Sequence, residues 1–158
     1  MTRAVIALGA NLGDARAALA GAVEAMRRMP ELGILAESSV YSTAPIGGVE
    51  QPDYLNAVVI AETSLAPRDL LDALHGIEAD WHRTREVRWG PRTLDLDLID
   101  YRGVTSDDPE LTLPHPRAHE RAFVLVPWLE ADPGAELTGF GPVTDLIPGL
   151  GDQAITIA

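Results

Sequence analysis

The chain has 158 residues, of which 46% are hydrophobic and 23% are charged, and its formal net charge is -12. This composition is typical of a globular protein, and we expect residues 1–158 to form a single domain. Cysteine and lysine are both absent, which excludes a disulfide framework, a thiol nucleophile and a lysine-dependent phosphate loop. The acidic charge argues against nucleic-acid binding, and the lack of a signal peptide or long apolar run predicts a cytoplasmic protein with no membrane contact.

The first half of the chain contains one predicted helix and three predicted strands or strand-like runs. The apolar run at 4–8 predicts a buried strand, and Asp14 is placed to cap a helix that covers about 15–29. Residues 34–43 and 54–63 have the composition of strands. Two glycines and two prolines separate these two runs, so we expect a loop between them.

The second half begins with another predicted helix. It should begin at Ser64 or Pro67 and end near His82, with its apolar side chains on one face. An arginine-rich loop then leads into residues 94–101, where Leu or Ile alternates with Asp as in a half-buried strand. A turn and a third helix should follow, with Pro116 near the first helical position.

The predicted order of strands and helices is βαββαβ. This is the order of a ferredoxin-like sheet, in which helices cover one face and the other face is free for a site. We therefore predict an α/β (α+β) fold with a ferredoxin-like βαββαβ core, an additional C-terminal helix and short strands.

The strand predicted at 94–101 carries paired carboxylates. A period of two places Asp95 and Asp97 on one face, while the leucines beside them point into the core. Two neighbouring carboxylates suit Mg²⁺, which takes oxygen ligands from one or two carboxylates and from substrate phosphates. A solvent-facing polar edge is the alternative explanation of the same pattern.

Four arginines stand immediately before this strand. Guanidinium groups suit phosphate oxygens, although these arginines could instead pair with surface carboxylates. Carboxylates for a metal and arginines for phosphates together indicate a polyphosphate site. The arginines are Arg83, Arg85, Arg88 and Arg92.

His115 and His119 lie four residues apart in a proline-containing segment. This spacing loosely resembles a helical zinc site, but Glu120 follows the histidines instead of standing between them. His115 could alternatively donate to a phosphate at a helix start, or serve as a structural turn residue. By composition alone, Tyr54 and Phe123 are core side chains.

Four segments of the sequence occur in the order and spacing of a known family. They span about residues 4 to 133 and read ALGANLGD, SSVYSTAPIGGVEQPDYLNAVV, RTREVRWGPRTLDLDLI and LTLPHPRAHERAFVLVPWLEADP. The chain closely resembles the 6-hydroxymethyl-7,8-dihydropterin pyrophosphokinases of folate biosynthesis, and RWGPRTLDLD is highly specific to them. The resemblance implies transfer of a pyrophosphoryl group from ATP to the hydroxymethyl oxygen of the dihydropterin, with release of AMP.

The resemblance also implies roles for individual residues toward ATP, the co-substrate. Asp95 and Asp97 would hold two Mg²⁺ ions along the triphosphate, and Trp89 would belong to a mobile loop that closes over the nucleotide. Arg117 lies at a position that varies in the family and is given no role. The side chains at or near the ATP site would be Glu78, Arg83, Arg85, Arg92, Thr112, His115 and Arg121, of which Arg85, Arg92 and His115 would act in catalysis with the two aspartates.

In the same resemblance, the dihydropterin would lie between the rings of Tyr54 and Phe123. Asn56 would read the amide-like edge of the pterin, which discriminates because an unpaired buried amide costs roughly 1–3 kcal/mol. Loops 43–53 and 82–92 would be lids that exclude water. The remaining residues of the slot would be Thr43, Ala44, Pro45 and Ile46.

Two other functions are compatible with this fold. RNA-recognition modules share the βαββαβ order, but they stack bases on sheet aromatics within a basic surface, and this chain is acidic. A catalytically silent domain that binds ATP or pterin is the second alternative. We expect small-molecule substrates, no nucleic-acid or membrane partner, and a monomer.

Overall fold

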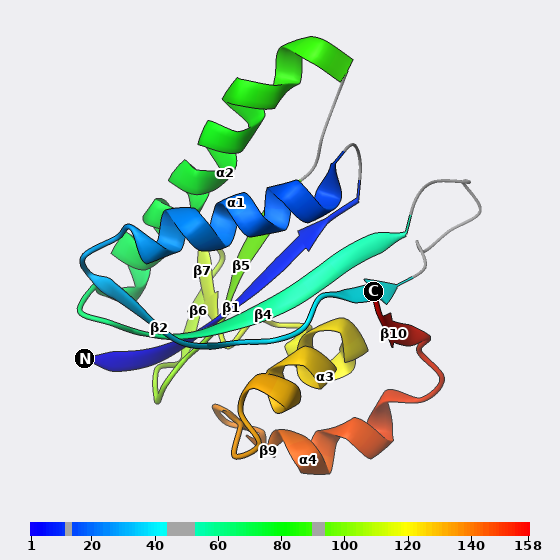
Figure 1. Ribbon diagram of the computed structural model, residues 1–158. Helices are drawn as coiled ribbons and strands as arrows, with labels where there is room; N and C mark the ends of the chain where they lie inside the picture. Colours follow the sequence, from blue (N-terminus) through cyan, green and yellow to red (C-terminus); the bar gives the residue numbers. More distant parts are fainter. Residues whose placement is uncertain (12–13, 44–52, 90–93) are drawn as a thin grey trace.

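The computed structural model describes the backbone of residues 1–11, 14–43, 53–89 and 94–158, and the side chains of the same ranges except at 82–89. Strands and helices alternate through most of the chain (Figure 1). They are β1 (Thr2–Ala10), α1 (Ala15–Arg27), β2 (Leu32–Glu37), β3 (Tyr41–Thr43), β4 (Tyr54–Thr63), α2 (Pro67–Trp89), β5 (Leu94–Tyr101), β6 (Ser106–Asp108), β7 (Leu111–Leu113), η1 (Ala118–Glu120), α3 (Ala122–Ala131), β8 (Glu136–Leu137), β9 (Gly141–Pro142), α4 (Val143–Leu146), η2 (Ile147–Leu150) and β10 (Ile155–Ile157).

The central sheet confirms the predicted ferredoxin-like core. Its strand order is β10-β3-β4-β1-β5, with β2 also paired to β4, and all of its pairings are antiparallel. The two middle strands, β1 and β4, pair along their whole length from Thr2 opposite Thr63 to Ala10 opposite Leu55. This register also brings Gly9 opposite Asn56 on one side and Asp95 on the other. Residues far apart in the sequence therefore meet at one end of the sheet.

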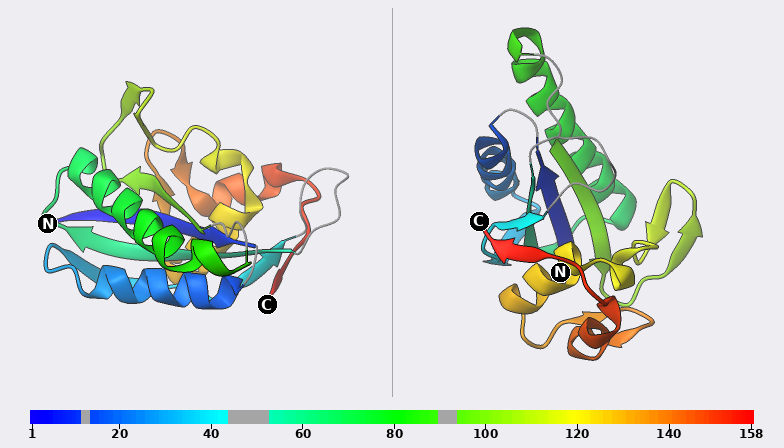
Figure 2. Two further views of the ribbon diagram at one scale, coloured as in Figure 1. Left: turned by 90° about the horizontal axis from the view of Figure 1, so that it is seen from above. Right: turned by 90° about the vertical axis from the view of Figure 1, so that its right-hand side faces the viewer.

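Two layers of helices enclose this sheet (Figures 1 and 2). The helices α1 and α2 cover one face, where the apolar side chains of β1, β4 and β5 form one buried cluster with them. On the other face, Val124, Leu125 and Trp128 of α3 pack against Val5 and Val58. The prediction that this second face is free was therefore only half right, because the apolar run of α3 needs a surface on which to be buried. The part left uncovered lies beside the start of α3.

The helices begin and end where local chemistry allows. Asp14 accepts a hydrogen bond from the Ala17 N–H at 3.1 Å, as predicted for the N-cap of α1. The predicted end of α2 near His82 is wrong, because the helix continues to Trp89. Residues 83–88 include no glycine or proline, so nothing in their composition interrupts the helix. The segment expected to be a loop at 82–92 is therefore helical as far as Trp89.

Two further boundaries differ from the predictions. Residues 34–43 form two strands instead of one, and at the break between them Ser38 and Ser39 form side-chain hydrogen bonds, while Ser38 keeps one backbone bond to Val58. The Ser38 hydroxyl accepts from the Val58 N–H at 2.9 Å, and the Ser39 hydroxyl donates to Glu130 at 2.8 Å. The third helix begins at Ala122 and not near Pro116, since the His115 N–H is bonded to the carbonyl of Ile99 in β5 at 2.8 Å.

The alternation predicted for β5 is confirmed over its first half. Leu94, Leu96 and Leu98 are buried among the helices, whereas Asp95 and Asp97 face the opposite side. An irregularity in the pairing with β1 then interrupts the alternation, and Ile99 joins the cluster beneath α3. Among the described helices, none is long and apolar enough to cross a membrane.

Tyr41 connects the sheet to α3 through a hydrogen bond. Its hydroxyl donates to Glu130 Oε1 at 2.7 Å. Burial, this hydrogen bond and the Glu130 charge raise the pKa of Tyr41 to about 12. For Glu130, partial burial raises the pKa, but the hydrogen bonds from Tyr41 and Ser39 outweigh it and the net pKa is lowered.

Replacing Tyr41 with phenylalanine is expected to lower the free energy of unfolding by about 0.5–1 kcal/mol near neutral pH, because a hydrogen bond to an exposed carboxylate is lost. The raised pKa of Tyr41 means that its contribution is complete below its ordinary pKa of 10.0 and disappears as the pH rises toward about 12. The lowered pKa of Glu130 means that its contribution disappears as the pH falls below 4.5. Urea unfolding of both proteins across this range measures the difference, which should narrow at both extremes; a constant difference would contradict the assignment.

Candidate active site

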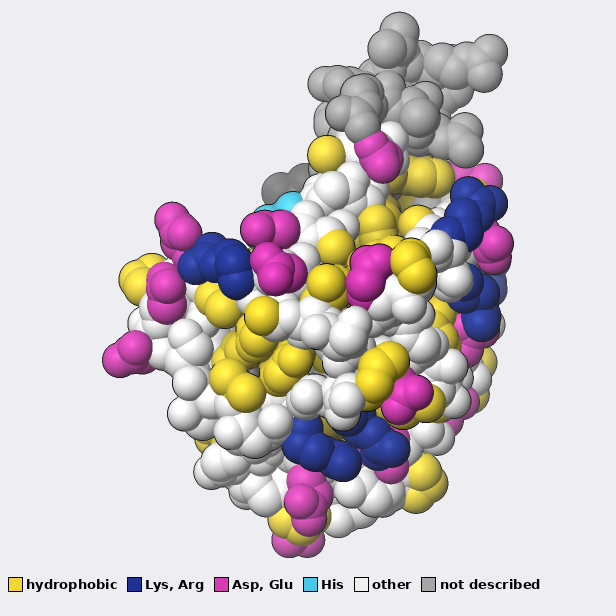
Figure 3. Space-filling view, turned by 90° about the vertical axis from the view of Figure 1, so that its left-hand side faces the viewer, with side chains coloured by type: hydrophobic (Ala, Val, Ile, Leu, Met, Phe, Trp, Pro, Cys, Tyr) yellow, Lys and Arg dark blue, Asp and Glu magenta, His cyan; other side chains and the backbone are white. Residues whose placement is uncertain are grey.

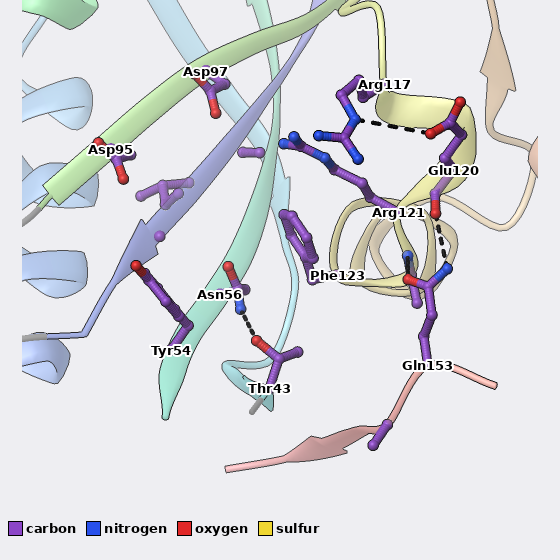
Figure 4. A pocket seen from close by; sticks show the side chains of 15 residues that line it. Thr43, Tyr54, Asn56, Asp95, Asp97, Arg117, Glu120, Arg121, Phe123 and Gln153 are labelled. Atoms are coloured by element: carbon purple, nitrogen blue, oxygen red, sulfur yellow. Dashed lines mark hydrogen bonds and ion pairs between the residues drawn. The ribbon is translucent and has the colours of Figure 1, made fainter. Parts of the chain in front are cut away.

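A pocket of about 620 Å³ opens beside the uncovered corner of the sheet. Strand residues form its floor, and residues from η1, α3 and the C-terminal segment form the opposite wall (Figure 4). The lining residues are Ala7, Leu8, Gly9, Thr43, Tyr54, Asn56, Asp95, Asp97, Arg117, Glu120, Arg121, Ala122, Phe123, Gln153 and Ala154.

One end of the pocket is aromatic. Tyr54, at the start of β4, and Phe123, in the first turn of α3, lie on either side of Asn56 (Figure 4). Asn56 is buried, and its Nδ2 donates to the Thr43 hydroxyl at 2.9 Å. That bond orients the amide and leaves Oδ1 beside Gly9. This end can hold a flat ring and offer it one oriented amide.

The other end of the pocket is charged. Asp95 and Asp97 extend from β5, while Arg117 and Arg121 extend from the opposite wall (Figure 4). The Arg121 guanidinium carbon also lies 5.3 Å from the centre of the Phe123 ring, a cation–π contact that joins the two ends. Carboxylates face guanidinium groups across a space that a polyphosphate and its metal could occupy.

The charges at this end influence one another. Burial lowers the pKa of His115; the Asp97 charge opposes this shift, and Arg121 and Arg117 add to it. Burial likewise lowers the pKa of Arg121, with a further lowering from Arg117 and an opposing effect of Asp97. His115 therefore belongs to the same electrostatic group as Asp97, Arg117 and Arg121, although it does not line the pocket.

Glu78 supports β5 from α2. Its Oε2 accepts from the Leu96 N–H at 2.8 Å, on the side of β5 where no strand of the described residues pairs with it. Burial raises the pKa of Glu78, while the bond from Leu96 lowers it and the charges of Asp95 and Asp97 raise it further. Glu78 thus holds β5 at Leu96, the residue between the two aspartates, and the charges of both aspartates affect its pKa.

Comparison with known proteins decides the family. Residues 5–133 match the sequence model of the 7,8-dihydro-6-hydroxymethylpterin-pyrophosphokinase (HPPK) family. The chain belongs to the HPPK family. Enzymes of this family transfer a pyrophosphoryl group from ATP to hydroxymethyldihydropterin in folate biosynthesis.

Individual HPPK relatives agree with this assignment. The 2-amino-4-hydroxy-6-hydroxymethyldihydropteridine pyrophosphokinase of Methylorubrum extorquens is 46% identical over 139 residues, covering 88% of this chain and 88% of its own. That of Pseudomonas aeruginosa is 43% identical over 135 residues, covering 85% of this chain and 83% of its own. Wild-type HPPK-DHPS of Plasmodium falciparum superimposes with a TM-score of 0.71 at 13% identity, and this similarity bears on the fold alone. It covers 94% of this chain and 44% of that protein.

Most of the described residues predicted for the HPPK site meet in the pocket. Its lining includes Thr43, Tyr54, Asn56, Asp95, Asp97, Arg121 and Phe123. Of the other predicted residues, His115 and Glu78 are bonded to β5 near the two aspartates, His115 through the carbonyl of Ile99 and Glu78 through the N–H of Leu96. Thr112 does not line the pocket; it lies in the β6–β7 hairpin, where its hydroxyl donates to the Asp108 carbonyl at 3.0 Å. Its assignment to the ATP site stays a prediction.

The remaining predicted residues lie outside the described part of the chain. Ala44, Pro45, Ile46 and Arg92 are outside the described residues altogether. Arg83, Arg85 and Trp89 belong to the helical backbone of α2, but their side chains are not described. The loose resemblance of His115 and His119 to a zinc site, against which the sequence itself argued, gains no support among the described residues, where the His119 ring stacks on Phe140 with the ring centres 4.6 Å apart.

Gly9, Arg117 and Gln153 are among the lining residues of this pocket that sequence reasoning missed. Gly9 forms part of the floor within β1, and a glycine inside a strand was a usable signal of close approach. Arg117 lines the wall beside Arg121 despite its variable position in the family. Gln153 comes from the C-terminal segment, where no motif or spacing indicates a function.

Replacing Gly9 with alanine is expected to weaken dihydropterin binding about 10-fold, because the added Cβ would stand 3.2 Å from Asn56 Oδ1 and push the amide from its position. The change itself should not destabilise the strand, since alanine restricts the unfolded chain more than glycine does. The matched control is Gly33→Ala in β2, where the new Cβ would meet only the Glu62 side chain at 3.6 Å. Titration of each variant with dihydropterin measures the effect, and equal affinities would show that the floor tolerates a methyl group.

Proposed function

We propose that this pocket is where the chain carries out the pyrophosphoryl transfer of its family. One observation carries the proposal: the aromatic end around Asn56 and the charged end around Asp97 belong to a single pocket, joined across Gly9. A pterin ring between Tyr54 and Phe123 would direct its hydroxymethyl group along the pocket toward the charged end. The nucleophile and the triphosphate would then meet without intervening water.

We propose that the ring is recognised by stacking and by one amide. Tyr54 and Phe123 would each contribute about 0.5–1.5 kcal/mol beyond the burial of area. Asn56 would read the polar edge of the pterin, and Thr43 would hold the Asn56 amide in place through the 2.9 Å bond. Ala44, Pro45 and Ile46 would complete the slot.

The donor set at the charged end supports two Mg²⁺ ions held by Asp95 and Asp97. Both residues line the pocket and supply only oxygen ligands, as Mg²⁺ prefers. In the described part of the chain, no third acidic or histidine side chain joins them in a metal-binding group, so phosphate oxygens and water would supply the other ligands. When bound, Mg²⁺ would neutralise charge on the triphosphate.

The chain's own cations would position the triphosphate. Arg121, whose guanidinium faces the pocket, would bind a phosphate, and His115, whose pKa is lowered by burial, would donate a hydrogen bond from its neutral ring to the α-phosphate. We propose that Arg85 and Arg92 also bind phosphate oxygens, near the β-phosphorus. The other side chains in or near the ATP site would be Arg83, Glu78 and Thr112. Trp89 would belong to the lid. The hydroxymethyl oxygen would form a bond to the β-phosphorus, while the bond between the β-phosphorus and the oxygen that bridges it to the α-phosphorus breaks. Its electron pair would leave with AMP, and the hydroxyl proton would be released.

The distribution of charge on the surface favours small molecules over nucleic acids as partners. On the face shown in Figure 3, basic side chains stand beside acidic ones, and no continuous basic stripe crosses it. Among the described arginines, Arg27 forms an ion pair with Glu37 at 2.9 Å, and Arg68 forms one with Asp108 at 3.3 Å. Nucleic-acid binding relies on free cations that displace counterions. We propose a cytoplasmic monomer in which residues 1–158 form one pyrophosphokinase domain.

A product assay tests the function. The protein is incubated with MgATP and 6-hydroxymethyl-7,8-dihydropterin, and AMP, ADP and pterin pyrophosphate are separated. We expect AMP and pterin pyrophosphate to form in equal amounts. ADP in place of AMP would mean attack at the γ-phosphorus, and tight ATP binding without either product would indicate a catalytically silent domain.

A further inference from the structure

The C-terminal segment reaches the pocket through Gln153. Its Oε1 accepts from the Ala122 N–H at 2.9 Å, and its Nε2 donates to the carbonyls of Glu120 and Leu150, both at 2.9 Å. Ala122 is the first residue of α3, and Arg121, its N-cap, makes no side-chain capping bond. The cap of α3 is therefore supplied by a residue 31 positions later in the chain.

This cap holds the part of α3 that faces the pocket. Arg121 and Phe123 flank Ala122 and both line the pocket, and they contact each other at 5.3 Å. Glu120, whose carbonyl accepts the second bond, is the last residue of η1. Gln153 thus joins the end of η1 to the start of α3. Its bonds hold the backbone from which the Arg121 and Phe123 side chains extend.

The same segment also holds the opposite side of the aromatic end. Directly after Gln153, β10 pairs with β3, and Ile155 lies opposite Thr43. Thr43 in turn accepts the bond from Asn56. Residues 153–155 therefore bridge the wall that carries Phe123 and the strand that carries Thr43 (Figure 4).

The Gln153 amide cannot also read a ligand through its nitrogen. Both hydrogens of Nε2 are donated to backbone carbonyls, and Oε1 already accepts one bond. Its effect on a ligand must therefore pass through the residues that it holds. Small displacements of those residues are sufficient to have an effect, because a misplacement of about 1 Å can lower the reaction rate by as much as 10²-fold.

We propose that Gln153 is a positioning residue that sets the separation between Phe123 and the Thr43–Asn56 pair, and hence the fit of the dihydropterin ring. The inference rests on the function proposed above. It predicts a larger effect at the dihydropterin end of the pocket than at the ATP end. The segment around Gln153 holds both sides of the dihydropterin end, through Ala122 and Thr43. At the ATP end it acts through Arg121 only, because its three hydrogen bonds do not involve β5, which carries Asp95 and Asp97.

Gln153→Met tests the inference, because methionine keeps a side chain of similar length and makes none of the three bonds. Asp152→Ala is the matched control, since Asp152 is an exposed neighbour outside the pocket. Wild-type protein is first shown to form pterin pyrophosphate. Dihydropterin affinity is then titrated in the presence of a non-hydrolysable ATP analogue, and the KM of each substrate and the melting temperature are measured.

We expect Gln153→Met to weaken dihydropterin binding and raise its KM about 10-fold, with less than about a 2-fold change in the KM of ATP. Asp152→Ala should match the wild type. An unchanged dihydropterin affinity would overturn the inference, and so would an equal loss for both substrates with a lower melting temperature, which would mean general loosening. A wild-type protein that forms no pterin pyrophosphate would refute the proposed function itself, and this inference with it.

Discussion

Replacing Asp97 with alanine is expected to lower kcat by about 10³-fold, while dihydropterin affinity stays within about 3-fold of the wild type. Asp97 interacts with several ionisable groups around the charged end, because its charge shifts the pKa values of His115, Arg121 and Glu78. It also provides one of the two carboxylates proposed to hold Mg²⁺. Removing it takes away an interaction made along the triphosphate, and leaves the aromatic end intact. Steady-state kinetics with dihydropterin titration separates the two effects.

The Asp97→Ala variant should remain folded. Its side chain is only half-buried and stands beside Asp95, so removing one charge also relieves a like-charge repulsion. We expect the melting temperature to change by less than about 4 °C. Asp145→Ala, at an exposed residue of α4 outside the pocket, is the control for loss of a carboxylate. If Asp97→Ala kept more than roughly a tenth of wild-type turnover, the proposed metal role would be wrong.

Replacing Asn56 with alanine is expected to weaken dihydropterin binding by about 10- to 100-fold, because a ligand amide edge would be buried without its partner. Asn56 is 6% exposed, and its orientation is held by Thr43. The KM of ATP should change little, since the phosphate-facing residues lie at the other end of the pocket. Direct titration with dihydropterin, with an ATP analogue present, measures the loss.

Thr43→Val provides a graded comparison for Asn56. Valine has nearly the shape of threonine but cannot accept the bond from Asn56 Nδ2. The amide stays in the pocket but is less well oriented, so we expect a smaller loss of about 3- to 10-fold. A Thr43→Val variant as weak as Asn56→Ala would mean that Thr43 contacts the ligand itself. Asn56→Ala with wild-type affinity would remove Asn56 from the recognition of the pterin.

The sequence predicted well those features that depend on neighbouring residues. The alternation of Leu and Asp placed Asp95 and Asp97 on the pocket face of β5, and helical spacing identified the buried face of α2. Asp14 was identified as a cap because capping involves residues three positions apart. The motif RWGPRTLDLD indicated the family, which the match over residues 5–133 confirmed.

Two of the wrong boundaries share one physical cause. The single strand predicted at 34–43 is interrupted because Ser39 bonds to Glu130, 91 residues later in the chain. The third helix begins late, at Ala122, where the cap comes from Gln153. Propensity and periodicity describe only a short window of sequence, so they carry no information on a partner that distant.

Local spacing and one specific motif were sufficient to predict the class of fold, the family and the chemical types at the two ends of the pocket. The width of the pocket and the residues that close it depend on the folded chain. The pairing of β1 with β4 places Gly9 opposite Asn56 on the neighbouring strand, and the bond from Ala122 to Gln153 holds Arg121 and Phe123 on the other wall of the pocket. Those placements arise from antiparallel register and long-range hydrogen bonds, which form only when the whole chain is folded.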